Sequence, residues 1–352
     1  MHLQRIRSHP TIKDVAKRAG VSIATVSRVI NKTAPVQDNT AIRVVSAVEA
    51  LKYRPKAAAR ILARQRTDTI GLLLPVISGD FFAEMLQGIE RGVVEGGYDL
   101  LIHSTFTGVK PYSVYKHVLG EHNTDGLIIF SDSLDDGELQ RFHDIGFPIV
   151  LLHRSSPAGL NIPCVTVENK NGARSIVDHL IEAHGRRRIV FLRGPQGHED
   201  STWRELGYRQ ALERHEIPYD PDLVDMGNFN SQDAREAMQR LLDRHVLFDA
   251  VFAGDDDSAS GALAALQSAG FRIPQDISLA GFDNSPLAFY LTPPLTTINA
   301  HIQEAGYTAA QKLVQLIHSG QADPITLLPT EMVIRRSCGC TQDGQRRCQG
   351  KE

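Results

Sequence analysis

The N-terminal part of the chain contains the stretch Thr11-Ile-Lys-Asp-Val-Ala-Lys-Arg-Ala-Gly-Val-Ser-Ile-Ala-Thr-Val-Ser-Arg-Val-Ile-Asn31. The apolar residues of its first half recur at the spacing of one helix face. They are Ile12, Val15, Ala16 and Ala19. Thr11 precedes this helix as its N-cap, and Asp14 stands at the acidic position of a capping box. The pattern therefore predicts a helix that starts at residue 12 and ends before Gly20.

A second short helix is predicted over residues 23–30, with Val26, Val29 and Ile30 facing inward. Two short helices joined by a glycine turn indicate a helix-turn-helix over residues 12–31. A third helix is predicted over residues 38–51. Its buried face is expected to carry Ile42, Val45, Val48 and Leu51.

Arg54-Pro55 ends this helical domain, because proline disfavours the helical conformation of the residue before it. Residues 56–64 then favour a helix of about two turns, which is marginal in water by itself. We expect residues 10–54 to form the helix-turn-helix domain and residues 55–66 to form a hinge helix.

Charge is divided unevenly along the chain. Residues 1–66 hold 14 Lys and Arg against 3 Asp and Glu, whereas the other 286 residues hold 24 against 38. A basic head of +11 on a body of −14 favours a polyanionic partner for the head. The alternative is a solvated charged face, which charge alone does not exclude.

From residue 69 onward, short apolar runs alternate with amphipathic helical stretches. The apolar runs are residues 70–74, 100–102, 126–130, 148–152, 189–192, 250–253 and 277–281. The helical stretches are residues 82–95, 171–183, 203–215, 232–245 and 258–269. This alternation is typical of parallel sheets with crossover helices. It predicts two doubly wound halves with a ligand crevice at the carboxyl ends of the strands.

Composition excludes several classes of protein. No apolar run reaches the roughly 18 residues that a membrane span requires, and the basic N-terminus lacks the apolar segment of a secretory signal. We therefore expect a cytoplasmic protein. Cys338 and Cys340 could bind a metal, but no His or third Cys follows at ligand spacing, so free thiols in a reducing compartment are favoured.

The second helix carries the chemistry of a DNA-reading element. Ser22 and Thr25 place hydroxyls at its positive N-terminal end, where they can bind phosphate. Arg28 can read guanine with two hydrogen bonds in the major groove. The exposed side is expected to present Ile23, Ala24, Ser27 and Arg28. The alternative is an ordinary helical hairpin with solvated polar residues.

These residues resemble the N-terminal signature of the lactose-repressor/galactose-repressor family of bacterial regulators. The resemblance continues through Tyr53-Arg-Pro and Ala59-Arg-x-Leu62, and it covers residues 10–337. In the body it includes Phe81-Phe82, Gly88-Ile-Glu90, Asp125-Gly-Leu, Arg204-x-x-Gly-Tyr208, residues 255–261, Ile273-Pro, Ile277-Ser, Gly281-Phe-Asp283-Asn and Pro293-Pro-Leu-Thr-Thr-Ile298.

The resemblance implies roles in DNA binding for matching positions. Ser22, Thr25 and Asn31 would hold phosphates, and Ile23, Ala24 and Arg28 would face base edges. Leu62 would wedge into the minor groove and kink it, unless it is a core leucine. The full expected interface is Thr11, Ser22, Ile23, Ala24, Thr25, Ser27, Arg28, Asn31, Lys56, Ala59 and Leu62. Gln37 departs from the family, which often has Ser there as a helix cap and phosphate contact.

For the body, the resemblance implies a fold like that of periplasmic sugar-binding proteins, in which two subdomains close on a small ligand. Arg204, Asp255 and Asp283 match positions that contact effector, and charged groups of this kind can hold adjacent hydroxyls. The alternative for these three residues is surface ion pairing. Aromatic residues can cover a sugar ring. The expected effector site is Phe81, Phe82, His153, Trp203, Arg204, Asp255 and Asp283. His153 stands where several family members have Asp, which leaves the ligand open.

The clustered carboxylates of Asp255, Asp256 and Asp257 could in principle bind Mg²⁺. Adjacent residues at the start of a helix point in different directions, so helix capping and favourable interaction with the helix dipole are favoured instead. The sequence contains neither a phosphate-binding P-loop motif nor the Gly-x-Ser-x-Gly elbow of hydrolases. We expect no enzyme, no cofactor and no metal.

Taken together, the sequence predicts a small all-α domain joined by a hinge helix to an α/β body of two doubly wound subdomains, residues 67–340. The subdomains are expected at about 67–165 with 299–326 and about 166–298 with 327–340, followed by a disordered tail, residues 341–352. The expected function is a dimeric transcription regulator, acting as a repressor, that binds a near-palindromic double-stranded operator under control of a sugar-like effector. A transport-type sugar-binding protein and a sugar-modifying enzyme are the alternatives. Whether effector releases DNA or promotes its binding stays open.

Overall fold

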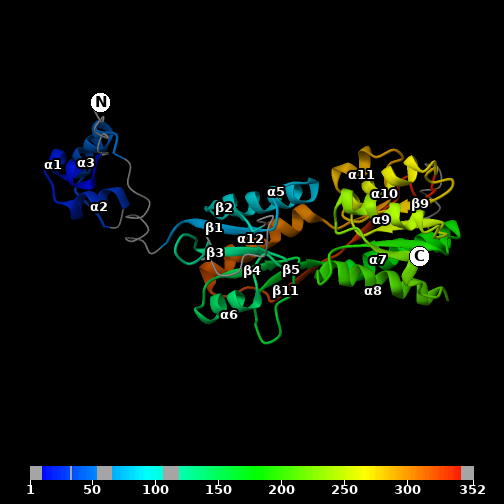
Figure 1. The fold of residues 1–352 in the computed structure, drawn as a ribbon. Helices are drawn as coiled ribbons and strands as arrows, with labels where there is room; N and C mark the ends of the chain where they lie inside the picture. Colours follow the sequence, from blue (N-terminus) through cyan, green and yellow to red (C-terminus); the bar gives the residue numbers. More distant parts are fainter. Residues whose placement is uncertain (1–9, 32–33, 54–65, 106–118, 342–352) are drawn as a thin grey trace, which may run out of the picture. The chain divides into compact units, whose positions relative to one another are not determined.

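A computed structural model describes residues 10–31, 34–53, 66–105 and 119–341 of the chain. The chain divides into two compact units, Met1–Thr67 and Asp68–Glu352. Figure 1 shows a small helical unit at the N-terminus and a larger body of strands and helices. Each unit has its own buried apolar cluster, which is the requirement for independent folding. The expected hinge and C-terminal tail lie outside the described residues, except for Arg66 and Thr341 at their borders.

The N-terminal unit consists of α1 (Ile12–Ala19), α2 (Ile23–Asn31) and α3 (Asp38–Leu51), as predicted. At the start of α1 the Asp14 carboxylate accepts hydrogen bonds from the backbone N–H of Thr11 at 2.8 Å and from its hydroxyl at 2.7 Å. These contacts lower the pKa of Asp14 and fix the start of the helix. Gly20 ends it in the left-handed conformation, at φ 64°.

The buried face of α3 differs from the prediction. Val44 and Ala47 are buried with Val48 and Leu51 beside them, whereas Ile42 is 62% exposed and Val45 is 48% exposed. The predicted series used steps of three residues, each of which drifts about 60° around a helix of 3.6 residues per turn. The observed series Val44, Ala47, Val48 and Leu51 falls at positions i, i+3, i+4 and i+7 and stays on one face.

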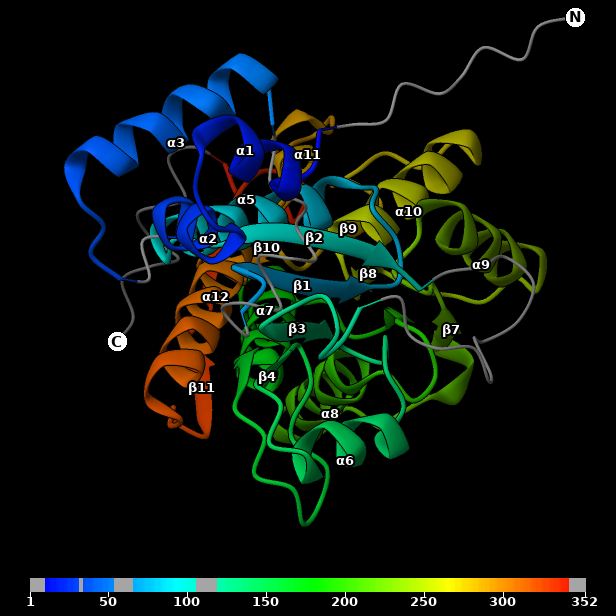
Figure 2. The same cartoon turned by 90° about the vertical axis from the view of Figure 1, so that its left-hand side faces the viewer.

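The first sheet of the body is fully parallel and has six strands in the order β11-β5-β4-β3-β1-β2. The strands are β1 (Thr69–Leu74), β2 (Asp99–Ser104), β3 (Gly126–Phe130), β4 (Ile149–Leu152), β5 (Cys164–Val167) and β11 (Ile325–Leu328). Its helices are α5 (Asp80–Glu95), α6 (Asp136–Asp144) and α12 (Ile302–Ser319). Ile128 and Val150 pack in the cluster that holds α5 and α12, whereas their neighbours Leu127 and Leu151 pack with α6. Helices therefore cover both faces (Figure 2).

The second sheet has four parallel strands in the order β7-β6-β8-β9. They are β6 (Ile189–Arg193), β7 (Val224–Met226), β8 (Ala250–Ala253) and β9 (Ser278–Ala280). Its helices are α7 (Asn169–His184), α8 (Glu199–Arg214), α9 (Ser231–Asp243), α10 (Asp256–Ser268) and α11 (Pro286–Tyr290), and a 3-10 turn spans Pro221–Leu223. Two strands, β10 (Thr297–Asn299) and β12 (Glu331–Val333), form a separate antiparallel pair.

The predicted fold class of the body, two doubly wound parallel halves, is confirmed by these sheets. The chain passes between the halves after β5, after β10 and after β11. The expected subdomain junction at residues 326 and 327 falls inside β11, which belongs wholly to the first sheet. Sequence periodicity did not single out α6, α12, β5 or β11. None of the helices in the described ranges combines the length and apolar character that spanning a bilayer requires.

Candidate functional site

The body contains a cavity of about 630 Å³ whose walls come from the carboxyl ends of strands in both sheets. The residues of the first wall follow β1 in the chain or lie at the end of β3. The residues of the second wall follow β6, β7, β8 and β9. The lining residues are Pro75, Val76, Ser78, Gly79, Phe81, Phe82, Phe130, Pro195, His198, Asp200, Arg204, Asn228, Phe229, Asn230, Asp233, Asp255, Asp257 and Asp283. The predicted crevice is therefore present where parallel strands end.

Arg204 on α8 organises the polar wall of this cavity. It is only 2% exposed, and its Nη2 donates to Asp283 Oδ1 at 3.1 Å. Nε donates to Asn169 Oδ1 at 2.8 Å, and Nη1 donates to the carbonyl of Gly254. The guanidinium also lies over the Phe282 ring, 3.8 Å from its centre. A buried guanidinium with this set of partners is held in one orientation.

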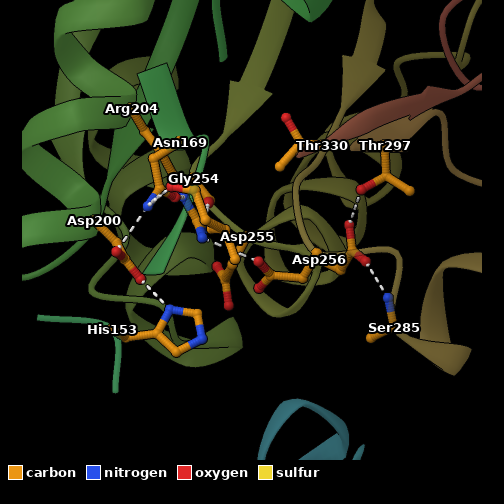
Figure 3. A network of polar contacts seen from close by, with 12 residues as sticks. His153, Asn169, Asp200, Arg204, Gly254, Asp255, Asp256, Ser285, Thr297 and Thr330 are labelled. Carbon is orange, nitrogen blue, oxygen red and sulfur yellow. Dashed lines mark hydrogen bonds and ion pairs between the residues drawn. The ribbon is translucent and has the colours of Figure 1, made fainter. Parts of the chain in front are cut away.

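A second part of the same network ends at His153 (Figure 3). Asp200 accepts from Asn169 Nδ2 at 2.8 Å, and its other oxygen lies 2.8 Å from His153 Nδ1. Burial alone would raise the pKa of Asp200, but the charges of His153 and Arg204 outweigh it and lower this pKa to about 2. Asp200 is therefore ionised at neutral pH, and it connects the His153 side chain to that of Arg204 through Asn169.

The carboxyls at the start of α10 point in different directions, as predicted. Asp255 caps the helix by accepting from the backbone N–H of Ser258 at 3.0 Å. Asp256 turns away from the cavity and accepts from the backbone N–H of Ser285 and the hydroxyl of Thr297 (Figure 3). Asp257 lines the cavity. These carboxyls do not converge in the described structure as ligands of one metal ion would.

Burial has a strong effect on these acids. It raises the pKa of Asp255 to about 7, with a further contribution from the charge of Asp283. Burial also raises the pKa of Asp283, although Arg204 opposes this shift. Near neutral pH the cavity wall can thus offer both protonated and ionised carboxyls, that is, both donors and acceptors.

The wall from the first sheet is aromatic. Phe81 and Phe82 at the start of α5 pack edge to face with Phe130, with ring centres 5.9 and 5.3 Å from the Phe130 ring. Gly79 turns the chain from β1 into α5 at φ 91°. An aromatic wall facing a polar wall can bind a ring that has one apolar face and several hydroxyls.

Two of the expected effector contacts do not reach the cavity lining. Trp203 lies next to Arg204 on α8, but a step of one residue turns a helix by about 100°, so the two side chains diverge. Trp203 is 42% exposed, and its indole N–H donates to Glu199 at 3.2 Å. His153 is fully buried behind the lining and contacts Phe81 and Phe130 through its ring. The other five, Phe81, Phe82, Arg204, Asp255 and Asp283, are brought together.

Sequence reasoning missed several lining residues. His198 and Asp200 follow β6, and Phe229, Asn230 and Asp233 follow β7. His198 is half-buried, its Nε2 lies 3.0 Å from Ser131 Oγ, and its buried Nδ1 has no hydrogen-bond partner among the described residues. Their position in the sequence could have identified them, because each of these residues follows the carboxyl end of a parallel strand.

In the N-terminal unit, α2 presents one exposed face. Ser22, Ile23, Ala24 and Arg28 are exposed, whereas Val26 packs inward against α1 and α3. The Ser22 hydroxyl accepts from the backbone N–H of Thr25 at 3.1 Å and thereby starts the helix. Ser27 and Asn31 are half-buried and are joined by a 3.2 Å hydrogen bond. Thr11 is exposed at the start of α1. Lys56, Ala59 and Leu62 lie outside the described residues.

Residues 11–56 match the family described as bacterial regulatory proteins, lacI family, and residues 177–338 match the periplasmic binding protein-like domain. The chain is 34% identical over 328 residues to the ribose operon repressor of Halalkalibacterium halodurans, an alignment that covers 93% of this chain and 96% of that protein. The chain belongs to the lacI family. It is also 34% identical over 340 residues to the regulator CelR of Thermobifida fusca, covering 94% and 99% of the two chains.

Solved structures agree with this membership in the lacI family. The lac repressor dimer bound to operator and the anti-inducer ONPF superposes with a TM-score of 0.78 at 25% identity, covering 94% of this chain and 99% of that one. The complex of the regulator CelR with cellobiose gives a TM-score of 0.68 at 31% identity, covering 93% and 99%. The predicted resemblance to lactose and galactose repressors is confirmed.

Proposed function

We propose that this lacI-family protein is a transcriptional repressor that binds a near-palindromic operator as a dimer and responds to a neutral, polyhydroxylated effector. The observation that carries the proposal is the buried Arg204–Asp283 pair, which opens on a cavity whose opposite wall is aromatic. The exposed face of α2 supports the DNA-binding part, because it offers hydroxyls at a helix N-terminus and Arg28 for base readout.

A sugar is the ligand class that the cavity supports best. Asp255, Asp257 and Asp283 outnumber the one guanidinium that lines it, so there is no surplus positive charge for a phosphate. His198 Nδ1 adds a buried polar atom that a ligand hydroxyl can pair with. Among similar proteins, the CelR complex contains cellobiose, and a lacI-family regulator from Enterococcus faecium, 26% identical, has bound ribose.

The proposed control is a linkage between effector binding and the relative orientation of the two halves of the body. The effector contacts walls from both sheets, so it stabilises whichever orientation places those walls together. In the described part of the body the chain crosses between the halves in three segments, and the halves can rotate about these segments. The same orientation would govern the hinge residues 55–66 and hence operator affinity.

A titration of the full-length protein tests this proposal. We expect one or more neutral mono- or disaccharides to raise its melting temperature and to change its affinity for an operator duplex, because a ligand that binds the native state stabilises it. Sugar phosphates should bind more weakly than the parent sugars. Tight binding of a sugar phosphate, or a ligand that stabilises the body without any effect on DNA affinity, would contradict the proposal.

The same proposal places the protein in the cytoplasm, where operator DNA is, and assigns it no catalytic role. The relatives named above are regulators. A turnover assay with the sugar that gives the largest thermal shift distinguishes a sugar-modifying enzyme, since a regulator returns its ligand unchanged.

A further inference from the structure

Four side chains with metal-binding atoms meet in the second half of the body, away from the cavity described above. His179 and His184 come from the last turns of α7, and Cys338 and Cys340 come from the segment that follows β12. One ligand atom from each residue lies within 4.8 Å of all the others. His179, Cys338 and Cys340 are buried, and His184 is half-buried.

The distances within this cluster match a tetrahedral centre. Cys340 Sγ lies 3.5 Å from His184 Nε2 and 3.7 Å from His179 Nε2. A tetrahedron built with Zn–S of about 2.3 Å and Zn–N of about 2.0 Å separates sulfur from nitrogen by about 3.5 Å. Both imidazoles therefore present Nε2 to the sulfur at the separation that a shared zinc ion requires.

The backbone around the thiols is shaped for this cluster. Gly339 separates the two cysteines at φ 117°, a conformation that a residue with a side chain rarely adopts. A Cβ at Gly339 would lie 3.0 Å from His184 Nδ1, so a larger residue here would push the ring away from its observed position. The Thr296 hydroxyl donates to Cys338 Sγ at 3.1 Å, a contact typical of the groups that surround metal-bound thiolates.

The charges of the four side chains and their access to solvent also fit a metal site. Two thiolates and two neutral imidazoles would balance the charge of a divalent cation, and an unbalanced charge is costly in a buried site. Gly339 and Cys340 also line a surface hollow, which provides a path for an ion to enter.

We propose that His179, His184, Cys338 and Cys340 bind one zinc ion in a Cys₂His₂ site that ties the C-terminal segment of the body to α7. All four positions are supplied by protein, which is the pattern of a structural rather than a catalytic zinc. The ion would fasten the segment that carries β12 to the first helix of the second half.

Metal analysis of the untagged full-length protein, purified without chelators, tests the proposal. We expect one zinc per chain in the wild type and in the control Cys348→Ser, and loss of zinc in Cys338→Ser and in His184→Asn. Zinc retained by the double variant Cys338→Ser/Cys340→Ser would overturn the proposal, because the ion would then be bound elsewhere.

Cobalt substitution keeps the test decisive if those variants fail to fold. Wild-type protein stripped of metal under reducing conditions should give, on addition of Co²⁺, intense visible bands of a tetrahedral site and a thiolate-to-cobalt charge-transfer band, both removed by excess Zn²⁺. Asp178, Glu182 and His215 form another group of ligand atoms, and cobalt bound there would lack the thiolate band. Folded, reduced wild type that binds no zinc and shows no thiolate band would refute the site.

Discussion

At the scale of single residues, the cavity depends on charged groups that have been removed from water. Arg204 and Asp283 are almost fully buried, and each is held by the other and by further contacts. A buried charge without its partner is costly, whereas a satisfied pair is fixed in position. Residues of this kind are suited to ligand recognition, because the protein has oriented them before the ligand arrives.

The substitution Asp283→Asn is expected to weaken effector binding at least about tenfold, since a hydrogen bond to a charged group contributes roughly 1.5–3 kcal/mol. Operator affinity without effector should be unchanged, because the N-terminal unit has its own buried cluster. Calorimetric titration with the sugar identified by thermal shift measures the first effect. The matched control is Asp276→Asn, whose partner Arg272 is on the surface. Equal losses in both variants would argue against a role for Asp283 in the site.

The substitution Asp255→Asn should change the pH dependence of stability. The folded-state pKa of about 7 lies above the ordinary aspartate value of 3.8, so between about pH 4 and pH 7 the folded protein holds a proton that the unfolded chain has lost. The wild-type free energy of unfolding therefore falls as pH rises through this window and is level above it. Asparagine removes this pH dependence, and its side-chain oxygen can still accept the hydrogen bond from the Ser258 N–H that caps the helix.

The stability of the Asp255→Asn variant relative to wild type should thus increase from about pH 4 to pH 7, by on the order of a few kcal/mol. Urea unfolding of both proteins across this range measures it. Burial, the largest cause of the raised pKa of Asp256, is the same in both proteins, so most of the contribution of Asp256 cancels in the difference; only the effect of the Asp255 charge on it, the smallest cause, does not. A difference that does not vary with pH would show that Asp255 is ionised throughout.

At the scale of elements, the helix starts of the N-terminal unit differ in how well they are capped. α1 has Thr11 and Asp14, and α2 has the Ser22 hydroxyl, whereas Gln37 at the start of α3 makes no side-chain capping hydrogen bond. Four N–H groups at a helix start lack partners within the helix. α3 is consequently the helix of this unit in which a single residue can add stability.

Gln37→Ser is expected to stabilise α3 by about 1 kcal/mol, because serine at the N-cap accepts a hydrogen bond from a backbone N–H in the first turn. Hydrogen exchange of the full-length protein should show slower exchange for the amides of residues 40–51 and unchanged exchange in α7. Gln37→Ala serves as the control and should give no gain. Slower exchange in the alanine variant as well would point to a cause other than capping.

At the scale of the whole molecule, the separation of positive and negative charge along the chain determines which part is attracted to DNA. The head of residues 1–66 carries +11 and the remainder −14, so long-range attraction to DNA is concentrated in one small unit. The acidic body keeps the net charge at −3. Sequence-independent binding should therefore come from the head alone.

Operator binding by the proposed dimer is expected to depend steeply on salt. Each phosphate neutralised by the head contributes roughly −0.9 to the slope of log K against log salt concentration, and two heads should neutralise several. Fluorescence anisotropy at a series of salt concentrations measures the slope. Arg28→Ala should lower specificity for the operator over random duplex. A nearly flat salt response would show that the head does not dock as proposed.

The sequence by itself determined those features that depend on neighbours along the chain. Helix periodicity and the Gly20 break located α1 and α2, and the alternation of apolar runs with amphipathic stretches located most strands and helices of the body. Local spacing is sufficient for these elements because hydrogen bonding and side-chain direction in helices and strands repeat over a few residues. Arg204, Asp255 and Asp283 were predicted as cavity residues from the family resemblance of the motifs that contain them.

Only the tertiary structure decided which faces and which distant residues meet. Arg204 and Trp203 were both expected to contact the effector, but the packing of α8 directs only the Arg204 side chain into the cavity. Cys338 and Cys340 had no ligand partner nearby in sequence, yet the fold brings them to His179 and His184, more than 150 residues upstream. Contacts of this separation follow from how whole sheets and helices pack, and the spacing of residues along a chain does not encode them.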